Sequence, residues 1–187
     1  MDEFNNIPYF RRFKESDAPI FIQNLEIEKV YEHMRAEFPR TRSEVKDFII
    51  ASEKGETNNF AIEYKDSLVG MISLFHKNGE PGSFEIGCMW IFKQFLGLGI
   101  ATYETKKFVI KAFDEYKASK VYICTYEENK APQRIISNMG FIFYSYSWYK
   151  NNKKLCYYEM TRKQFEKNRE IFEVTWEDHR RKLSPNL

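Results

Sequence analysis

The chain has 187 residues, of which 43% are hydrophobic and 17% aromatic, which suffices for one sizeable core and is too little for two comfortable domains. Basic residues number 29 and acidic residues 27, so the formal net charge of +2 gives no long-range field that would recruit nucleic acid or an anionic membrane. No segment reaches the roughly 18 apolar residues of a membrane span, and the N-terminal sequence has no apolar signal region. Three well-separated cysteines without C-x-x-C spacing suit a reducing compartment, so we expect a cytoplasmic protein without metal, nucleic-acid or membrane partners.

Hydrophobic periodicity in the first half of the chain predicts helices followed by strands. A three-to-four-residue repeat indicates a helix, and alternation indicates a strand. The expected elements are a strand at 7–13, helices at 16–26 and 43–54, and strands at 59–64, 68–75 and 83–91. In the last strand, alternation puts Phe84, Ile86, Cys88 and Trp90 on one face, opposite Glu85. Three strands joined by tight turns predict an antiparallel meander.

The second half of the chain predicts more elements of both kinds. They are a helix at 101–116, a strand at 120–125, a helix at 131–139, strands at 141–149 and 155–160, and a further helix within 163–183. Alternation predicts that half of the aromatic run at 141–149 is core, which leaves Tyr144, Tyr146 and Trp148 as pocket candidates.

The order of these elements predicts an α+β fold. We expect a mixed, mostly antiparallel central sheet of about seven strands with helices on both faces. One domain at 1–162 is followed by a helical extension at 163–187, which docks on its own domain or builds a homodimer.

The stretch "LGLGIAT", Leu96–Thr102, places two glycines between an apolar strand and a helix. Such a turn leaves backbone N–H groups at the positive end of a helix, where phosphate binds. A P-loop would need a Lys-Ser/Thr pair where the chain has Ile100 and Ala101. A dinucleotide fingerprint would need a third glycine where Thr102 stands, and a parallel strand-helix-strand unit. Both alternatives fail.

The same turn resembles the pyrophosphate loop of the GNAT superfamily of acyl-CoA-dependent N-acetyltransferases, Gln/Arg-x-x-Gly-x-Gly/Ala. Gly99 and Ala101 match this motif, whereas Leu96 replaces the usual Gln or Arg. An offset register from Gln94 fits the letters but starts the helix two residues early.

A second segment, "NKAPQRIISNMGF" at Asn129–Phe141, resembles the family's Asn-x-Ala helix start that closes with Gly-Phe. The order of elements from Ile7 to Met160 also resembles the family, most closely its branch that acetylates the N-termini of ribosomal proteins. The resemblance implies an acyl-CoA N-acyltransferase fold with acetyl-CoA as cosubstrate.

The resemblance also implies a set of site residues. Glu85, six residues before Ile91, is the candidate general base, and its plainer interpretation is a carboxylate that is solvated or paired with a basic residue. The acetyl-CoA-binding residues implied are Met89, Trp90 and Ile91 for the pantetheine arm and carbonyl, Leu96, Gly97, Leu98, Gly99, Ile100, Ala101 and Thr102 for the pyrophosphate, and Asn129 for the pantetheine arm. Asn129 is also a candidate helix N-cap.

The family's usual proton donors for the leaving thiolate are missing. The tyrosine position holds Ile136, and the serine position of the N-terminal acetyltransferase branch holds Pro132. Substitutes nearby are Ser137, Tyr122, Tyr126, Tyr144, Tyr146 or a water molecule.

The resemblance predicts an N-acetyltransferase that acts by direct attack of a primary amine in a ternary complex. At pH 7, deprotonating a lysine-like amine of pKa ~10.4 costs roughly 4 to 5 kcal/mol, whereas an α-amino group of pKa ~8 costs about 1 kcal/mol. A protein N-terminal α-amine is the first acceptor expected from the branch resemblance. The alternatives are a small amine, such as a polyamine or aminoglycoside, and a catalytically silent acyl-CoA-binding regulator.

Overall fold

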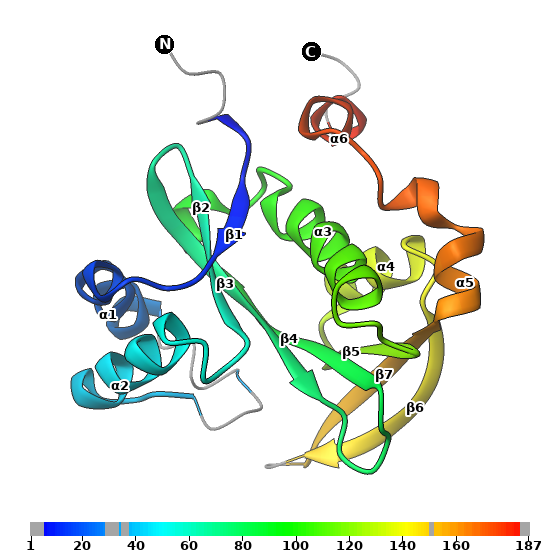
Figure 1. Cartoon of the computed structure of the whole chain (residues 1–187), viewed down its shortest axis with the longest axis horizontal. Helices are drawn as coiled ribbons and strands as arrows, with labels where there is room; N and C mark the ends of the chain where they lie inside the picture. The colour runs from blue at the N-terminus through cyan, green and yellow to red at the C-terminus, as the bar shows by residue number, and fades with distance from the viewer. Residues whose placement is uncertain (1–5, 29–33, 35–37, 150–151, 184–187) are drawn as a thin grey trace. The chain divides into compact units, whose positions relative to one another are not determined.

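The computed structural model describes residues 6–28, 34, 38–149 and 152–183. In these residues seven strands form one sheet with the order β1-β2-β3-β4-β5-β7-β6 (Figure 1). The strands are β1 (Tyr9–Arg11), β2 (Asn59–Tyr64), β3 (Ser67–His76), β4 (Ser83–Ile91), β5 (Lys120–Tyr126), β6 (Ile142–Tyr149) and β7 (Lys153–Thr161). The pairing of β4 with β5 is parallel, and those of β1 with β2, β2 with β3, β5 with β7 and β6 with β7 are antiparallel. The predicted mixed α+β sheet is confirmed.

Helices lie between groups of these strands and after the last one. Among the described residues the α helices are α1 (Ala18–Glu28), α2 (Arg42–Glu53), α3 (Ile100–Asp114), α4 (Lys130–Asn138), α5 (Arg162–Lys167) and α6 (Trp176–Leu183), and short 3-10 turns lie at Glu15–Asp17, Lys93–Phe95 and Arg169–Ile171. The chain divides into two compact units, one of residues 1–73 with 88–104 and the other of residues 74–87 with 105–187.

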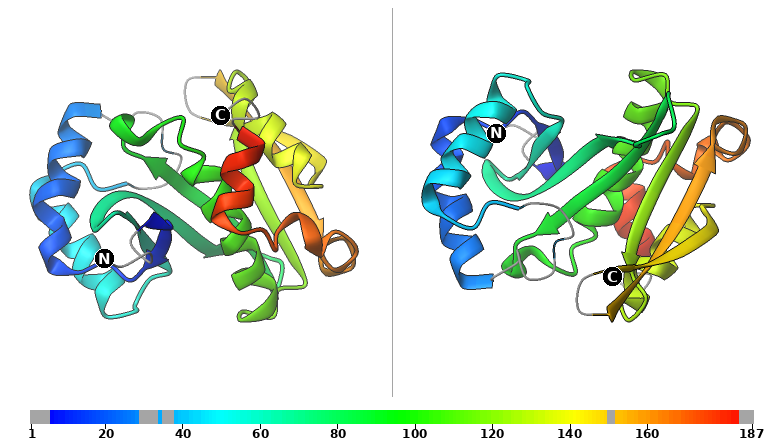
Figure 2. Two further views of the ribbon diagram at one scale, coloured as in Figure 1. Left: turned by 90° about the horizontal axis from the view of Figure 1, so that it is seen from above. Right: turned by 90° about the horizontal axis from the view of Figure 1, so that it is seen from below.

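The first unit contains an aromatic core beneath α1 and α2, which lie side by side (Figures 1 and 2). Phe21 of α1 makes an edge-on contact with Trp90 of β4 at 5.3 Å between ring centroids. Thr41 begins α2 with a capping box, in which its hydroxyl accepts a hydrogen bond from the Glu44 N–H. Capping and an apolar face together therefore hold α2 on this core.

The first predicted strand is shorter than expected, because only Tyr9–Arg11 pairs with β2. The Arg11 guanidinium instead ties this strand to the turn before α1. It donates to both carboxylate oxygens of Asp17, at 2.7 and 2.9 Å, and to Glu63 of β2 at 2.5 Å. The chain leaves the sheet after Arg11, and Phe13 enters the aromatic core with no exposed surface.

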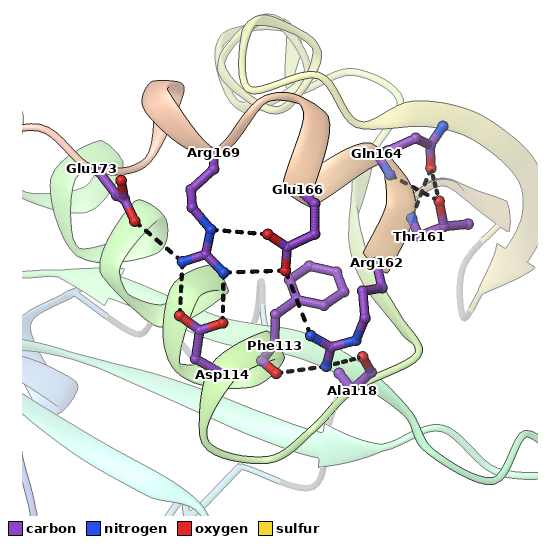
Figure 3. A network of polar contacts seen from close by, with 9 residues as sticks. All are labelled: Phe113, Asp114, Ala118, Thr161, Arg162, Gln164, Glu166, Arg169 and Glu173. Atoms are coloured by element: carbon purple, nitrogen blue, oxygen red, sulfur yellow. Dashed lines mark hydrogen bonds and ion pairs between the residues drawn. The ribbon is translucent and has the colours of Figure 1, made fainter.

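In the second unit the C-terminal extension docks on the end of α3, as one of the two predicted alternatives had it. The Arg169 guanidinium donates to both carboxylate oxygens of Asp114, each at 2.9 Å (Figure 3). It also bonds Glu166 and Glu173, and it lowers the pKa of Asp114 through its hydrogen bonds. The extension comprises α5, a 3-10 turn and α6 rather than a single helix, and the predicted domain boundary at 162 stays a prediction.

Apolar packing supports the same docking. Phe165 of α5 is fully buried and stacks on Phe113 of α3, with ring centroids 4.5 Å apart. The Arg162 guanidinium donates to the carbonyl oxygens of Phe113 and Ala118 at 2.6 and 2.7 Å, so it satisfies acceptors at the end of α3 (Figure 3).

Strand β6 contradicts the prediction that half of the run at 141–149 is core. It is the outermost strand of the second unit and pairs with β7 (Figure 2). Most of its large side chains are 51 to 67% exposed, namely Ile142, Phe143, Tyr144, Tyr146 and Trp148. Alternation buries one face of a strand only where another layer covers it, and an edge position is not readable from the sequence.

Candidate functional site

The glycine turn lies in the first unit, directly before α3. Gly97 and Gly99 both have φ of +81°, a conformation that costs glycine little and other residues more. A Cβ at Gly97 would meet no heavy atom within 4 Å, so the backbone there is open to close approach. Helix α3 begins at Ile100, and the Tyr103 N–H donates to the Gly99 carbonyl at 3.0 Å. This geometry fits a diphosphate, with the positive end of the helix facing the turn.

The segment leading into this turn is anchored by the end of α1. The Glu28 carboxylate accepts hydrogen bonds from the Trp90 indole N–H at 2.8 Å and from the Lys93 backbone N–H at 2.7 Å. Leu96, in the position that usually holds Gln or Arg, is 61% exposed. A fixed start and two glycines therefore define the path of the turn.

Strand β4 lies unusually close to β3 at Gly70. A Cβ built on Gly70 would stand 2.1 Å from the Trp90 carbonyl oxygen and 3.0 Å from the Ile91 Cα. The position therefore admits only glycine without a shift of backbone.

The backbone of β4 also changes direction at Cys88, whose φ is +48°. This conformation interrupts the two-residue alternation, so the predicted common face of Phe84, Ile86, Cys88 and Trp90 does not run through the strand. Trp90 is buried in the aromatic core of the first unit. Alternation could not reveal this break, because a positive φ at a cysteine leaves no signal in the sequence.

Glu85 lies in the second unit within a cluster of polar and aromatic side chains. It is the registered neighbour of Tyr122 on β5, and Cys124 on β5 is registered with Tyr157 on β7, so these side chains share one face. Glu85 is 4% exposed, and its Oε1 accepts a hydrogen bond from the Cys124 thiol at 3.4 Å. The predicted placement of Glu85 opposite Phe84 and Ile86 agrees with this register.

Lys77, just after β3, brings a cation to the same cluster. Its Nζ lies 3.5 Å from Glu85 Oε2, 4.9 Å from the centre of the Tyr122 ring and 4.7 Å from that of Tyr157. Both the ion pair and the ring faces favour a positive charge at this point. Of the two plainer alternatives for Glu85, solvation or pairing with a basic residue, the ion pair with Lys77 is the one found, whereas no sequence motif pointed to Lys77 or Tyr157 as its neighbours.

Tyr122, a candidate proton donor, and Asn129 of the second signature both lie in the second unit. Tyr122 is buried and donates its phenolic O–H to Glu80 at 2.7 Å. Burial, as the larger cause, and this hydrogen bond together raise the pKa of Tyr122 to about 12. Asn129 stands at the N-cap of α4, as predicted, but its side chain makes no capping hydrogen bond. The Ile136 side chain is buried at the position of the family's tyrosine.

The model of the GNAT acetyltransferase domain matches residues 9–142. The chain belongs to the GNAT acetyltransferase family. The match spans β1 to the start of β6 and includes Glu85, the glycine turn and Asn129. A GNAT relative, the "Putative ribosomal N-acetyltransferase YdaF" of Bacillus subtilis (strain 168), is 37% identical over 79 residues. That alignment covers 42% of this chain and spans 43% of the relative's length.

Solved GNAT structures share the fold. An acetyltransferase of the GNAT family from Bacillus anthracis has a TM-score of 0.72 at 19% identity, covering 84% of this chain and 96% of that chain. RimL, a ribosomal L7/L12 α-N-protein acetyltransferase in complex with coenzyme A, has a TM-score of 0.70 at 16% identity, covering 83% of this chain and 94% of its own. These likenesses confirm the predicted acyl-CoA N-acyltransferase fold.

Among the residues that the structure describes, no three or more His, Cys, Asp or Glu side chains gather in a way that suits a metal ion. None of the described helices has the length and apolar character to cross a membrane.

Proposed function

We propose that the chain is an acyl-CoA N-acyltransferase that transfers an acetyl group from acetyl-CoA to a primary amine by direct attack in a ternary complex. The observation that carries the proposal is a buried carboxylate, Glu85, on β4, the strand that precedes the glycine turn. This turn has two glycines with positive φ, and the family match covers both the carboxylate and the turn. A base and an anion-binding turn are the two parts that this chemistry requires.

In this proposal acetyl-CoA supplies the acetyl group as a thioester. The backbone N–H groups of Met89–Ile91 orient its carbonyl and pantetheine arm, together with Asn129, and the main chain of Leu96–Thr102 holds the pyrophosphate. Because Leu96 carries no polar side chain, the backbone contributes more of the pyrophosphate contact than in relatives with Gln or Arg.

Glu85 is proposed to accept the proton that the acceptor amine loses. Burial keeps bulk water away from the carboxylate, and the Cys124 thiol and the Lys77 ammonium fix its two oxygens. With Ile136 and Pro132 at the usual donor positions, we propose that a water molecule protonates the leaving thiolate.

The acceptor we propose first is the α-amine of a protein N-terminus. Support comes from the printed names of two relatives, a ribosomal N-acetyltransferase and an α-N-protein acetyltransferase. An α-amine also asks less of the base than a lysine-like amine, because its pKa lies nearer to neutral pH. A cytoplasmic location and a homodimer stay predictions.

A panel of amines tests the proposal. Purified protein is incubated with acetyl-CoA and, separately, peptides with free N-termini, a polyamine and an aminoglycoside, while free CoA thiol is measured. We expect thiol release with the peptides, and a loss of at least tenfold in Glu85→Gln. Undiminished turnover in the variant removes Glu85 as the base, and acetyl-CoA binding without thiol release from any amine supports the silent regulator instead.

A further inference from the structure

The surroundings of Glu85 contain a cation from the chain itself. Lys77 Nζ stands 3.5 Å from the carboxylate, between the ring faces of Tyr122 and Tyr157. Its side chain is 24% exposed, against 5% for that of Glu85. A carboxylate with two tyrosine faces is a binding site for an amine in its protonated form, and an amine already lies in it.

The backbone fixes where Lys77 begins. The Lys77 N–H donates to the Ser83 carbonyl at 2.9 Å, and its own carbonyl accepts from the Glu80 N–H at 3.1 Å. These bonds close the hairpin between β3 and β4, so the lysine stem starts from a defined point. The four-carbon stem then lets the ammonium rotate while it stays within reach of Glu85.

A tethered amine beside a base gains a large kinetic advantage over an amine in solution. Holding the amine beside the base replaces one bimolecular encounter by an intramolecular proton transfer, and the 3.5 Å between Lys77 Nζ and Glu85 Oε2 is the distance of an ion pair. In the free protein, no external acceptor is needed to bring a primary amine to Glu85.

We propose that Lys77 is an internal acceptor, whose Nζ the protein acetylates in cis. The inference rests on the proposed function, since it uses Glu85 as the base and acetyl-CoA as the donor. The ammonium gives one proton to Glu85, and the amine forms a C–N bond with the acetyl carbonyl while the thioester C–S bond breaks. The nitrogen loses a second proton to solvent, CoA leaves as a thiol after taking up one proton, and the product is an uncharged amide on Lys77.

Acetylation would change the cluster that it modifies. An amide carries no charge, so the ion pair with Glu85 and the charge contacts with both tyrosine rings end together. Self-modification of Lys77 would therefore remove the internal cation that pairs with Glu85.

The chain supplies a matched control in Lys120. Its Nζ also lies over the Tyr122 ring, at 5.3 Å, but its carboxylate neighbour is Glu159 at 3.1 Å. Hydrogen bonds with Tyr122 and Glu159 raise the pKa of Lys120, which holds it as an ammonium. Because the raised pKa of Lys120 also slows its non-enzymatic acetylation, a faster rate at Lys77 supports acetylation through Glu85 only when Glu85→Gln removes the difference.

The test is site-resolved mass spectrometry of the full chain incubated with acetyl-CoA alone. We expect acetyl-Lys77 to form at least tenfold faster than acetyl-Lys120, with a first-order rate constant independent of protein concentration, and Glu85→Gln to slow it at least tenfold. Equal rate constants at the two lysines, a rate constant that rises with protein concentration, or an unchanged rate constant in Glu85→Gln overturns the proposal. Glu85→Asp, which keeps a carboxylate on a shorter side chain, tests the same dependence if Glu85→Gln does not fold.

The amine panel distinguishes failure of the internal acceptor from failure of the proposed function. Thiol release with an external amine and no acetyl-Lys77 refutes the internal acceptor and leaves the proposed function intact. Thiol release that no amine accelerates, together with an unmodified Lys77, refutes both, because the thioester is then merely hydrolysed.

Discussion

Gly70→Ala is expected to damage β4 without touching any proposed catalytic group. The new Cβ would stand 2.1 Å from the Trp90 carbonyl oxygen, where contacts under 3.0 Å are essentially never found. This nearest atom belongs to the backbone of β4 and cannot rotate away, so β3 and β4 must separate by about 1 Å to relieve the overlap. Trp90 and the two residues beside it are the proposed contacts of the pantetheine arm.

The cost follows from the kind of strain. Overpacking a well-packed core typically costs about 1 to 3 kcal/mol, of which roughly 0.4 to 1 kcal/mol is regained because alanine restricts the unfolded chain. A net loss of about 1 to 2 kcal/mol lowers the Tm of a chain of this size by roughly 2 to 8 °C. Calorimetry measures this change, and isothermal titration with CoA should show weaker binding.

Gly87→Ala is the matched control in the same strand. Its Cβ would lie 3.1 Å from the far end of the Phe75 ring, which can move by a few tenths of an ångström. We expect a smaller fall in Tm and an unchanged affinity for CoA. A Gly70→Ala protein that melts within 1 °C of wild type and binds CoA equally well would refute the steric argument.

Three further predictions concern the second unit. Phe165→Ala should reduce the free energy of unfolding by about 3 to 5 kcal/mol in urea titrations, because the ring is fully buried, and a loss below 1 kcal/mol would mean that the extension is not part of the core. Arg169→Gln should lower the Tm at pH 7. The difference in Tm from wild type should fade as the pH falls below the unfolded Asp114 pKa of 3.8, because a carboxylate with a lowered pKa stabilises the fold only while it is ionised. A difference in Tm that stays constant with pH would contradict this. Tyr122→Phe should remove from an ultraviolet titration one phenol that ionises near pH 12. The free energy of unfolding should also fall less between pH 10 and 12, because in wild type the unfolded phenol ionises at a lower pH than the folded one. An unchanged titration would contradict this.

The sequence predicted most closely the elements that local patterns define. The bounds of β4 and β2 match the expected ranges, because alternation and turn glycines are local signals. The turn at Leu96–Thr102 opens a helix as expected, since the glycines and the periodic stripe after them lie next to each other in the chain.

Features that depend on distant partners were not predictable. Lys77 lies in a stretch for which the sequence predicts only a reversal of chain direction. Its contacts are with the rings of Tyr122 on β5 and Tyr157 on β7, which are 45 and 80 positions away in the sequence. The exposure of Trp148 likewise depends on which strand is last in the sheet, which is a property of tertiary pairing.

The sheet of the second unit has consequences for the order in which the chain can fold during translation. Strand β7 lies between β5 and β6, although the ribosome makes it after both. Until residue 161 has left the exit tunnel, β5 has no neighbour on that side, and β6 has no strand to pair with. The run from Ile142 to Trp148, rich in aromatic side chains, therefore stays unpaired on the nascent chain until β7 is made. Unpaired segments of this kind are prone to aggregate. Once β7 is made, it can pair with β5 and β6 together. A stop codon or a translational pause before β7 would therefore leave both β5 and β6 without this partner.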